Sequence, residues 1–132
     1  MMLIPTYVAP SHIEGVGLFA AEHIPAGALI WRLDPDFDRL LTRSRIATLS
    51  ALHQAFCERY GYPYPHDPGQ LIIELDNGRF MNHSGAPNTR FSDPDAGYAL
   101  AAIAAGEEHT CDYAEFDPSF EILPGRRFLP AE

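Results

Sequence analysis

The side chains best suited to chemistry gather in two short segments of the chain. Residues 79–88 read Arg-Phe-Met-Asn-His-Ser-Gly-Ala-Pro-Asn, and residues 103–113 form a turn followed by a predicted strand that ends in Tyr113. Taken singly, each polar residue is typical of a structural role. Asn82 and His83 would bind nearby backbone, and the tyrosine would keep a solvated hydroxyl. The ten residues of the first segment, taken together, favour a functional site.

A glycine-flanked turn lies nearer the amino-terminal end. Glu14 is followed by Gly15, Val16 and Gly17. Two glycines around one residue let the backbone turn tightly and approach a ligand without an intervening Cβ. Alone, the pattern is typical of a plain connection between strands, and it lacks the third glycine and following helix of a dinucleotide site.

The elements that must position these residues are mostly short strands. Apolar runs bounded by turn residues predict strands at residues 3–8, 18–21, 28–33, 71–75, 98–103 and 108–113. Asn77 and Gly78 form a strong hairpin-turn signal leading into residues 79–81.

One helix is predicted, over residues 40–60. Apolar residues recur there at three- and four-residue steps, and Thr42 or Ser44 can cap its start. Gly61 and the prolines after it end the helix. The chain is therefore predicted to be mostly β with one main helix.

Composition narrows the function classes. The chain has 132 residues with 46% hydrophobic and 20% charged residues, an ordinary balance for one globular domain. Its formal charge of −9, from nine arginines, no lysine and 18 acids, argues against nucleic-acid binding through a basic surface. There is no signal-peptide pattern and no apolar run of about 18 residues. We expect a cytoplasmic protein that does not enter a membrane, and the sequence leaves secretion open as the alternative.

Metal chemistry has little support in the sequence. Cys57 and Cys111 cannot supply a four-cysteine zinc site, and the sequence leaves open whether they form a disulfide. The six histidines show neither HxH nor HExxH spacing. This spacing makes an unrelated hydrolase or metal enzyme that uses the histidines a weak hypothesis, and we expect no metal site.

The three segments, in this order, resemble the motifs of the SET domain of protein lysine methyltransferases. The family's GxG turn matches residues 15–17, its (R)FxNHSxxPN segment residues 79–88, and its GEExTxDY segment residues 106–113. The resemblance implies several small twisted sheets around a C-terminal pseudoknot made by the second and third motifs, an exception to the rule that chains avoid threading. It implies one domain over residues 1–132.

The resemblance also assigns roles by position. Tyr113 would be the catalytic tyrosine. The cofactor S-adenosylmethionine would contact Glu14, Gly15, Val16, Gly17, Asn82, His83, Tyr113 and Phe116. The first four would hold its methionine part through backbone, and Asn82 and His83 would bind its amino and adenine ends. Leu33, Phe91 and Cys111 would line the channel for the substrate lysine. Since neither Phe91 nor Cys111 carries a hydroxyl, we expect di- or trimethylated product.

Three departures from the family pattern stand out. Many members carry a tyrosine near the position of Leu33, so that role is empty or moved, and the leucine usual before the threonine of the third motif is His109. The cysteine-rich zinc flanks of the large chromatin enzymes are absent, which resembles a minimal, stand-alone form. The closing segment at residues 114–132 would then cover the site by hydrophobic packing through Phe116, Phe120 and Phe128, and the helix at 40–60 would belong to the variable insert.

The resulting hypothesis is methyl transfer from S-adenosylmethionine to a lysine of a basic protein or tail. Residues 107–121 contain six acids and no lysine or arginine, which favours attraction of a basic peptide. The alternative is a catalytically inactive module of the same fold that binds cofactor or a basic peptide. Leu33 and His109 favour that alternative, whereas intact Asn82, His83 and Tyr113 oppose it.

Overall fold

A computed structural model describes residues 1–117 of the chain. Their backbone is mostly β, as the sequence predicts. Within this range, short strands form four small sheets, accompanied by two α-helices and two 3-10 turns. No helix in the described range is long and apolar enough to cross a membrane.

An antiparallel hairpin carries the glycine-flanked turn. β1 (Thr6–Pro10) pairs with β2 (Val16–Ala20) along its whole length. Leu18 and Ala20 of β2 are fully buried, because alternate residues of a strand point to the same face. Phe19 points the other way and stacks on the ring of the opposite β1 residue. The buried residues of β2 therefore anchor the hairpin in the hydrophobic core, and the hairpin fixes the turn at residues 11–16.

A second antiparallel sheet, in the order β3-β9-β8, crosses the middle of the molecule. Its strands are β3 (Leu29–Arg32), β8 (Thr89–Asp93) and β9 (Ala96–Ala99). The predicted strand at 98–103 is therefore shifted toward the amino terminus. Ile103 instead forms a separate bridge with Ile24, and both of these side chains are fully buried.

The two motif segments pair with each other. β7 (Asn82–His83) lies parallel to β10 (Thr110–Cys111), with Asn82 opposite Thr110 and His83 opposite Cys111. This pairing joins the two segments that the resemblance places in the pseudoknot. The predicted last strand is shorter than expected, because the chain turns into a 3-10 helix, η2 (Tyr113–Glu115).

The insert corrects the helix prediction. Residues 38–42 are not helical but form β4 (Asp38–Thr42), an edge strand of a sheet in the order β4-β6-β5. β6 (Asp67–Glu74) is the central strand, and β5 (Tyr62–Tyr64) is the other edge. The start of the predicted helix was wrong because pairing with β6 outweighs the helical spacing of the leucines there.

Two capping residues divide what remains of the predicted helix. Thr42 caps α1 (Arg43–Ile46), its Oγ1 accepting from Arg45 N at 3.1 Å. Ser50 caps α2 (Ala51–Tyr60) in the same way, its Oγ accepting from His53 N at 3.2 Å. Each cap satisfies an amide at a helix start, so the segment forms two helices rather than one.

The predicted hairpin turn at Asn77-Gly78 is also wrong. These residues begin a 3-10 helix, η1 (Asn77–Phe80), which leads from β6 to β7. The Asp76 carboxylate accepts from Gly78 N at 3.0 Å and starts the turn. This local hydrogen bond competes with a hairpin because a short acidic side chain can cap a helical turn.

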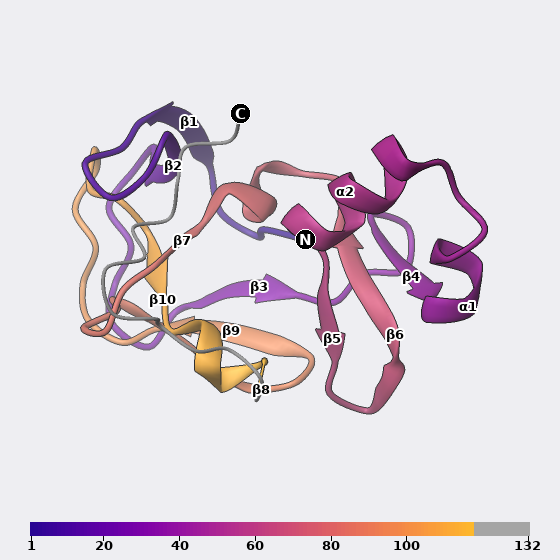
Figure 1. The fold of residues 1–132 in the computed structure, drawn as a ribbon. Helices are drawn as coiled ribbons and strands as arrows, with labels where there is room; N and C mark the ends of the chain where they lie inside the picture. Colours follow the sequence, from indigo (N-terminus) through magenta and orange to yellow (C-terminus); the bar gives the residue numbers. More distant parts are fainter. Residues whose placement is uncertain (118–132) are drawn as a thin grey trace.

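Two hydrophobic cores hold these sheets. The main core lies under the hairpin and the central sheet, and its large members are Leu18, Ile24, Ile30, Trp31, Met81 and Ile103. A smaller core in the insert joins Ile46, Cys57, Leu71 and Ile73. Figure 1 shows the hairpin and the β7–β10 pair at one end of the molecule and the insert sheet with α1 and α2 at the other. Cys57 and Cys111 belong to different cores and are free thiols.

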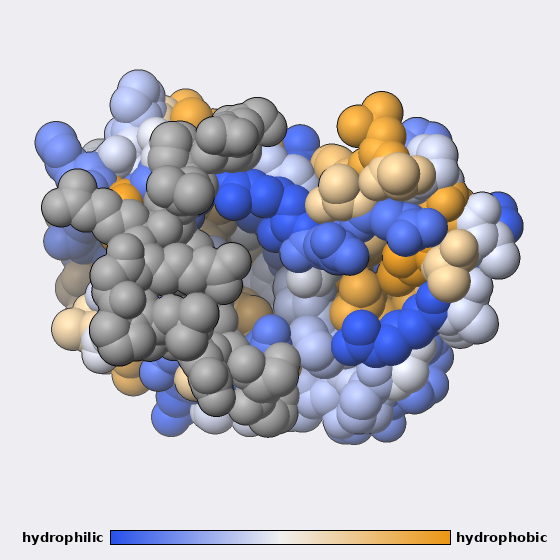
Figure 2. All heavy atoms as spheres, in the orientation of Figure 1, coloured by the Kyte–Doolittle hydropathy of each residue, from blue (hydrophilic) through white to orange (hydrophobic). Residues whose placement is uncertain are grey.

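The insert keeps part of its apolar surface outside. Leu52 and Phe56 of α2 are exposed, the former by 77%. Figure 2 shows hydrophobic surface over this helix. Of the expected closing segment, Phe116 belongs to the described residues, whereas Phe120 and Phe128 lie outside them.

Candidate active site

The parallel pair of β7 and β10 is fastened by one side chain. Asn88 donates from Nδ2 to the Glu108 carbonyl at 2.8 Å and accepts at Oδ1 from Thr110 N at 2.9 Å. The Thr89 hydroxyl adds a bond to the Thr110 carbonyl at 2.6 Å. The chain just after the Asn-His-Ser segment is therefore fixed to the strand that leads to Tyr113.

Tyr113 lies at the point where this pair ends. Its hydroxyl donates to the Met81 carbonyl at 2.7 Å, and its backbone N–H donates to His83 Nδ1 at 3.1 Å. Burial, first of all, raises the pKa of this hydroxyl well above its usual range. The phenol is therefore protonated at neutral pH and is held in one orientation.

The side chain of Asn82 faces the glycine-flanked turn. Its Nδ2 lies 3.1 Å from Ser11 Oγ, 3.0 Å from Glu108 Oε2, and 3.1 and 3.4 Å from the carbonyl oxygens of Val16 and Glu14. All four neighbours are acceptors, so they fix which end of the amide points toward the turn. The turn and the Asn-His-Ser segment form one polar cradle, which we define as residues 11, 14, 16, 82 and 108.

The two glycines of the turn serve different purposes. Gly15 has φ +42, in the left-handed region that favours glycine, and open space surrounds its Cα. Gly17 lies against the cradle, where a Cβ would come 2.8 Å from Glu108 Cδ and 3.1 Å from Asn82 Nδ2. The sequence suggested a close approach to a ligand, but in the structure the near neighbours of Gly17 are side chains of the protein itself.

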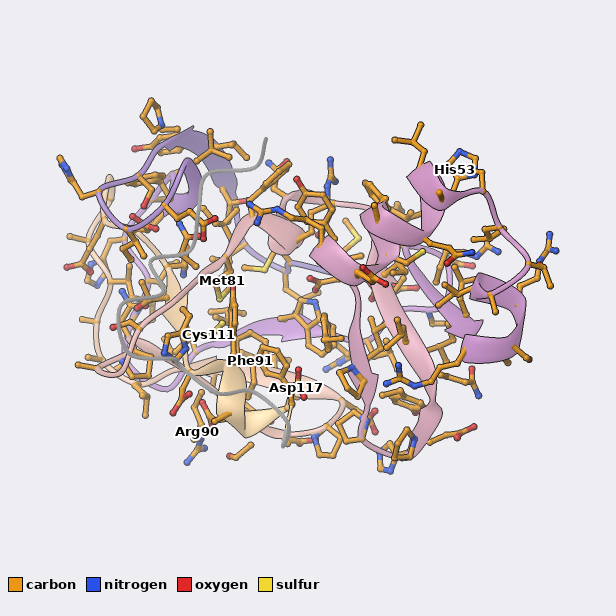
Figure 3. All side chains as sticks on the ribbon, in the orientation of Figure 1. His53, Met81, Arg90, Phe91, Cys111 and Asp117 are labelled. Atoms are coloured by element: carbon orange, nitrogen blue, oxygen red, sulfur yellow. The ribbon has the colours of Figure 1, made fainter. Side chains whose placement is uncertain are left out.

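The expected channel residues share one apolar cluster. Leu33, Phe91, Tyr113 and Phe116 all pack against the main core, which contains Cys111. The Phe116 ring lies 5.7 Å from that of Tyr113 and 6.1 Å from that of Phe91, measured between centroids. Figure 3 shows Met81, Phe91 and Cys111 gathered in the centre of the molecule. Cys111 is only 3% exposed, with its Sγ 4.0 Å from the Asn82 carbonyl.

A second tyrosine, Tyr62, belongs to this cluster. The sequence analysis did not predict a role for it. The Tyr62 ring, on the edge strand β5, lies 4.9 Å from the Phe116 ring. Burial, with a smaller contribution from Glu74, raises the pKa of its hydroxyl well above the usual value. Tyr62 thus supplies a tyrosine beside Phe116, although the sequence has none near Leu33. Its only sequence signal was its position in the Tyr-Pro-Tyr-Pro segment after the helix.

The insert reaches the cradle through one ion pair. Arg59, at the end of α2, lies 3.3 Å from Glu14 Oε1. The Glu14 side chain is 7% exposed and the Arg59 side chain 40%. The residues that the sequence reasoning missed here are Ser11, Arg59 and Glu108 as a cradle residue, because their partners lie far away along the chain.

A buried carboxyl group lies on the insert side of the cluster. Burial, then the charges of Asp76 and Asp38, raise the pKa of Glu74 to about 8. Glu74 is 7% exposed and in turn raises the pKa values of Tyr62 and Cys111. At pH 7 this carboxyl is mostly protonated, so it places little negative charge beside the cluster.

A pocket of about 340 Å³ opens between the β5–β6 hairpin and η2. Its walls are largely apolar, and one side carries acids. The lining residues are Arg43, Pro63, Tyr64, Pro65, Pro68, Glu115, Phe116 and Asp117. Because Phe116 also contacts Tyr113, the pocket is next to the expected catalytic tyrosine.

A sequence profile of the SET domain matches residues 15–114, about three quarters of the chain. The chain belongs to the SET-domain family. Its fold, of several small sheets around the β7–β10 pair, agrees with this. A search of the curated proteins found no match.

Solved structures share the fold of this SET domain. A humanized Polycomb Repressive Complex 2 of Chaetomium thermophilum bound to an inhibitor gives a TM-score of 0.64 at 19% identity. The match covers 98% of this chain but 19% of the Polycomb chain, so the SET domain spans about a fifth of that protein. A Plasmodium falciparum protein assigned as a histone methyltransferase gives a TM-score of 0.60 at 18% identity, covering 85% of this chain and 95% of that one.

His109, which stands where the family usually has leucine, is buried in the protein and is not one of the residues of the candidate site. The ring is fully buried, and its backbone N–H donates to the Leu18 carbonyl at 2.8 Å. Among the described residues, neither ring nitrogen has a hydrogen-bond partner. Burial lowers the pKa of this imidazole, so it is neutral and occupies the place of an apolar side chain.

Proposed function

We propose that this SET domain transfers a methyl group from S-adenosylmethionine to the side-chain amine of a lysine in a basic protein. The observation that carries the proposal is the surplus of hydrogen-bond acceptors in the cradle, next to a buried tyrosine hydroxyl. Membership of the SET-domain family supports the proposal.

The acceptor surplus fits the charged amino end of the cofactor. A primary amide carries two hydrogens, yet four acceptors lie within 3.4 Å of Asn82 Nδ2. One of the four is the Glu108 carboxylate. Ser11 and the Glu108 carboxylate already bond each other, so an ammonium group with three N–H donors would satisfy the two backbone carbonyl oxygens that remain and Asn82 Oδ1.

Other residues of the chain would hold the rest of the cofactor. His83 Nδ1 accepts from Tyr113 N, so the neutral ring carries its proton on Nε2, and we assign that group to the adenine end. Phe116 would cover the cofactor with an apolar ring. When bound, the cofactor supplies a methyl group on a positively charged sulfur.

The residues around Tyr113 would prepare the lysine. An unperturbed lysine is less than about 0.1% neutral at pH 7, so the amine has to lose its proton before it can react. Burial among Phe91, Phe116 and Tyr62 would lower its pKa, and the nearby sulfonium charge would lower it further. The Tyr113 hydroxyl donates a hydrogen bond to the Met81 carbonyl. Its oxygen is therefore left to accept a hydrogen bond from the amine and so to orient it.

The charge of the chain supports a basic substrate. The net charge is −9, and the acids of residues 107–117 lie on the segment that leads to and follows Tyr113. Glu115 and Asp117 line the pocket beside Phe116. A peptide rich in lysine or arginine would meet complementary charge on this face.

The proposal is tested by incubating the chain with isotopically labelled S-adenosylmethionine and a panel of basic proteins. Mass spectrometry would locate the methylated lysines and count the methyl groups, for which we expect two or three. Asn82→Ala should weaken cofactor binding about 10- to 100-fold, the usual loss for a bond to a charged group. Asn77→Ala, on η1, is the matched control and should bind normally.

Two results would contradict the proposal in different ways. If calorimetry and thermal shift detect no binding of S-adenosylmethionine at saturating concentration, the chain is not an enzyme that uses this cofactor. If the cofactor binds but no basic substrate is methylated, the inactive binding module is the better description.

A further inference from the structure

Glu108 has a fixed backbone and a side chain aimed into the cradle. Glu108 forms an isolated antiparallel β-bridge with Phe19 of β2, and its backbone carbonyl accepts a hydrogen bond from Asn88 Nδ2 at 2.8 Å. Because the backbone is held from two sides, the carboxylate can reach only a small region. That region lies between the glycine-flanked turn and β7.

The carboxylate holds two side chains from distant parts of the chain. Ser11 Oγ lies 2.8 Å from Oε1 and 2.9 Å from Oε2, and Asn82 Nδ2 lies 3.0 Å from Oε2. A carboxylate only accepts hydrogen bonds, whereas an amide can present either end. Glu108 therefore requires Asn82 to turn its N–H side toward the carboxylate and its Oδ1 away from the carboxylate.

The second glycine of the turn provides the room for this carboxylate. A Cβ on Gly17 would come 2.8 Å from Glu108 Cδ, closer than real Cβ atoms come to other atoms. The atoms that would have to move belong to the end of a flexible side chain. An alanine at this position would therefore displace the carboxylate from Asn82 while leaving the hairpin folded.

We propose that Glu108 is a positioning residue, which sets the Asn82 amide so that its oxygen accepts a hydrogen bond from the cofactor's amino group. This inference rests on the proposed function, because it needs a ligand with an amino group in the cradle. Glu108 then acts through Asn82 rather than on the reacting atoms. Its neighbour Glu107 is exposed and accepts from Ala104 N at 3.2 Å, outside the cradle.

The first test compares two ligands by calorimetry: S-adenosylhomocysteine, which has the amino group, and 5′-methylthioadenosine, which lacks the whole amino-acid part. Glu108→Ala should weaken binding of the first about 10- to 100-fold and change binding of the second by less than about threefold. Glu108→Gln keeps an acceptor and should recover most of the lost affinity. Glu107→Ala removes a carboxylate from the preceding residue, outside the cradle, and this variant should bind both ligands normally.

The second test uses the space beside Gly17. Gly17→Ala should reproduce the loss for S-adenosylhomocysteine, and combining it with Glu108→Ala should cause no further loss, since both changes break one contact. Additive losses would mean that the glycine and the glutamate act separately, which would overturn the proposal.

The remaining outcomes separate this inference from the function on which it rests. If the wild-type chain binds neither ligand, both fail. If it binds S-adenosylhomocysteine and Glu108→Ala behaves like Glu107→Ala, only the role of Glu108 is wrong. Equal weakening of both ligands by Glu108→Ala would show a general structural role, and a Glu108→Gln variant as weak as Glu108→Ala would show direct charge attraction. Either result would overturn the proposal.

Discussion

The Tyr113 hydroxyl is the group on which the proposed chemistry depends most directly. Tyr113→Phe should lower kcat by about 100-fold, because the hydroxyl orients the amine as the methyl group moves. Affinity for the cofactor and KM for the peptide should change little. The lost bond to the Met81 carbonyl should cost about 1 kcal/mol of stability. Steady-state kinetics decide this, with Tyr98→Phe as control, and an unchanged kcat would remove the catalytic assignment.

The buried imidazole of His109 predicts a stability effect with a definite pH dependence. His109→Leu removes two ring nitrogens that have no hydrogen-bond partner among residues 1–117, and it should stabilise the fold by about 1–3 kcal/mol at pH 7.5. Burial lowers the pKa of the folded histidine, so the unfolded chain binds more protons as the pH falls below about 6.5. That contribution to wild-type stability is present above this pH and is lost as the pH falls.

Urea unfolding at pH 7.5 and pH 5.5 measures both parts of the His109 prediction. The leucine variant should gain more over the wild type at pH 5.5 than at pH 7.5. His53→Ala, on the exposed side of α2, is the control and should show no such difference. A leucine variant less stable than the wild type at both pH values would mean that the ring has a partner or a packing role that leucine cannot supply.

The sequence predicts the candidate site residues that belong to motifs and does not predict the residues that contact them. The resemblance assigns roles to Asn82, His83 and Tyr113, and the structure brings these three residues together. Ser11 and Glu108 were not predicted as partners because they are 97 residues apart along the chain. Periodicity and turn signals carry information about neighbours in sequence, and no local pattern reports which distant carboxylate faces an amide.

The strands were predicted well where apolar runs are bounded by glycine or proline, and less well in the insert. There the leucines at three- and four-residue steps suit a helix, but Leu40 and Leu41 pair with Ile72 and Leu71 of β6 instead. Short apolar segments suit either structure, and the tertiary partner decides between them. Thr42 carries a capping signal at the start of the periodic pattern, whereas Ser50 lies inside that pattern, which continues on both sides of it.

That second cap gives a prediction for α2. Ser50→Ala should lower the free energy of unfolding by about 1 kcal/mol, and Ser50→Gly by only a few tenths. Urea unfolding measures both, and Ser92→Ala on the exposed side of β8 is a control for loss of a hydroxyl. If Ser50→Ala has no effect, the start of α2 is held by the insert core through Cys57 and Leu71 rather than by its cap.

The negative charge of the molecule is unevenly placed with respect to the site. Five acids lie between residues 107 and 117, and in that range there is no arginine or lysine. Two of them, Glu115 and Asp117, line the pocket beside Phe116. Glu74 contributes little to this field at pH 7, because its raised pKa keeps it mostly protonated. The acids of this range should therefore attract a basic peptide before any close contact forms.

This attraction predicts a dependence on salt. Raising the ionic strength from about 0.01 M to about 0.15 M shortens the screening length from about 30 Å to about 8 Å. For a peptide with several arginines around its target lysine, kcat/KM should fall about tenfold over that range, while kcat at saturating peptide stays nearly constant. A peptide with the same lysine among neutral residues is the control and should change much less. Equal salt dependence for the two peptides would mean that the acids serve only solubility, and that the apolar walls of the pocket select the substrate.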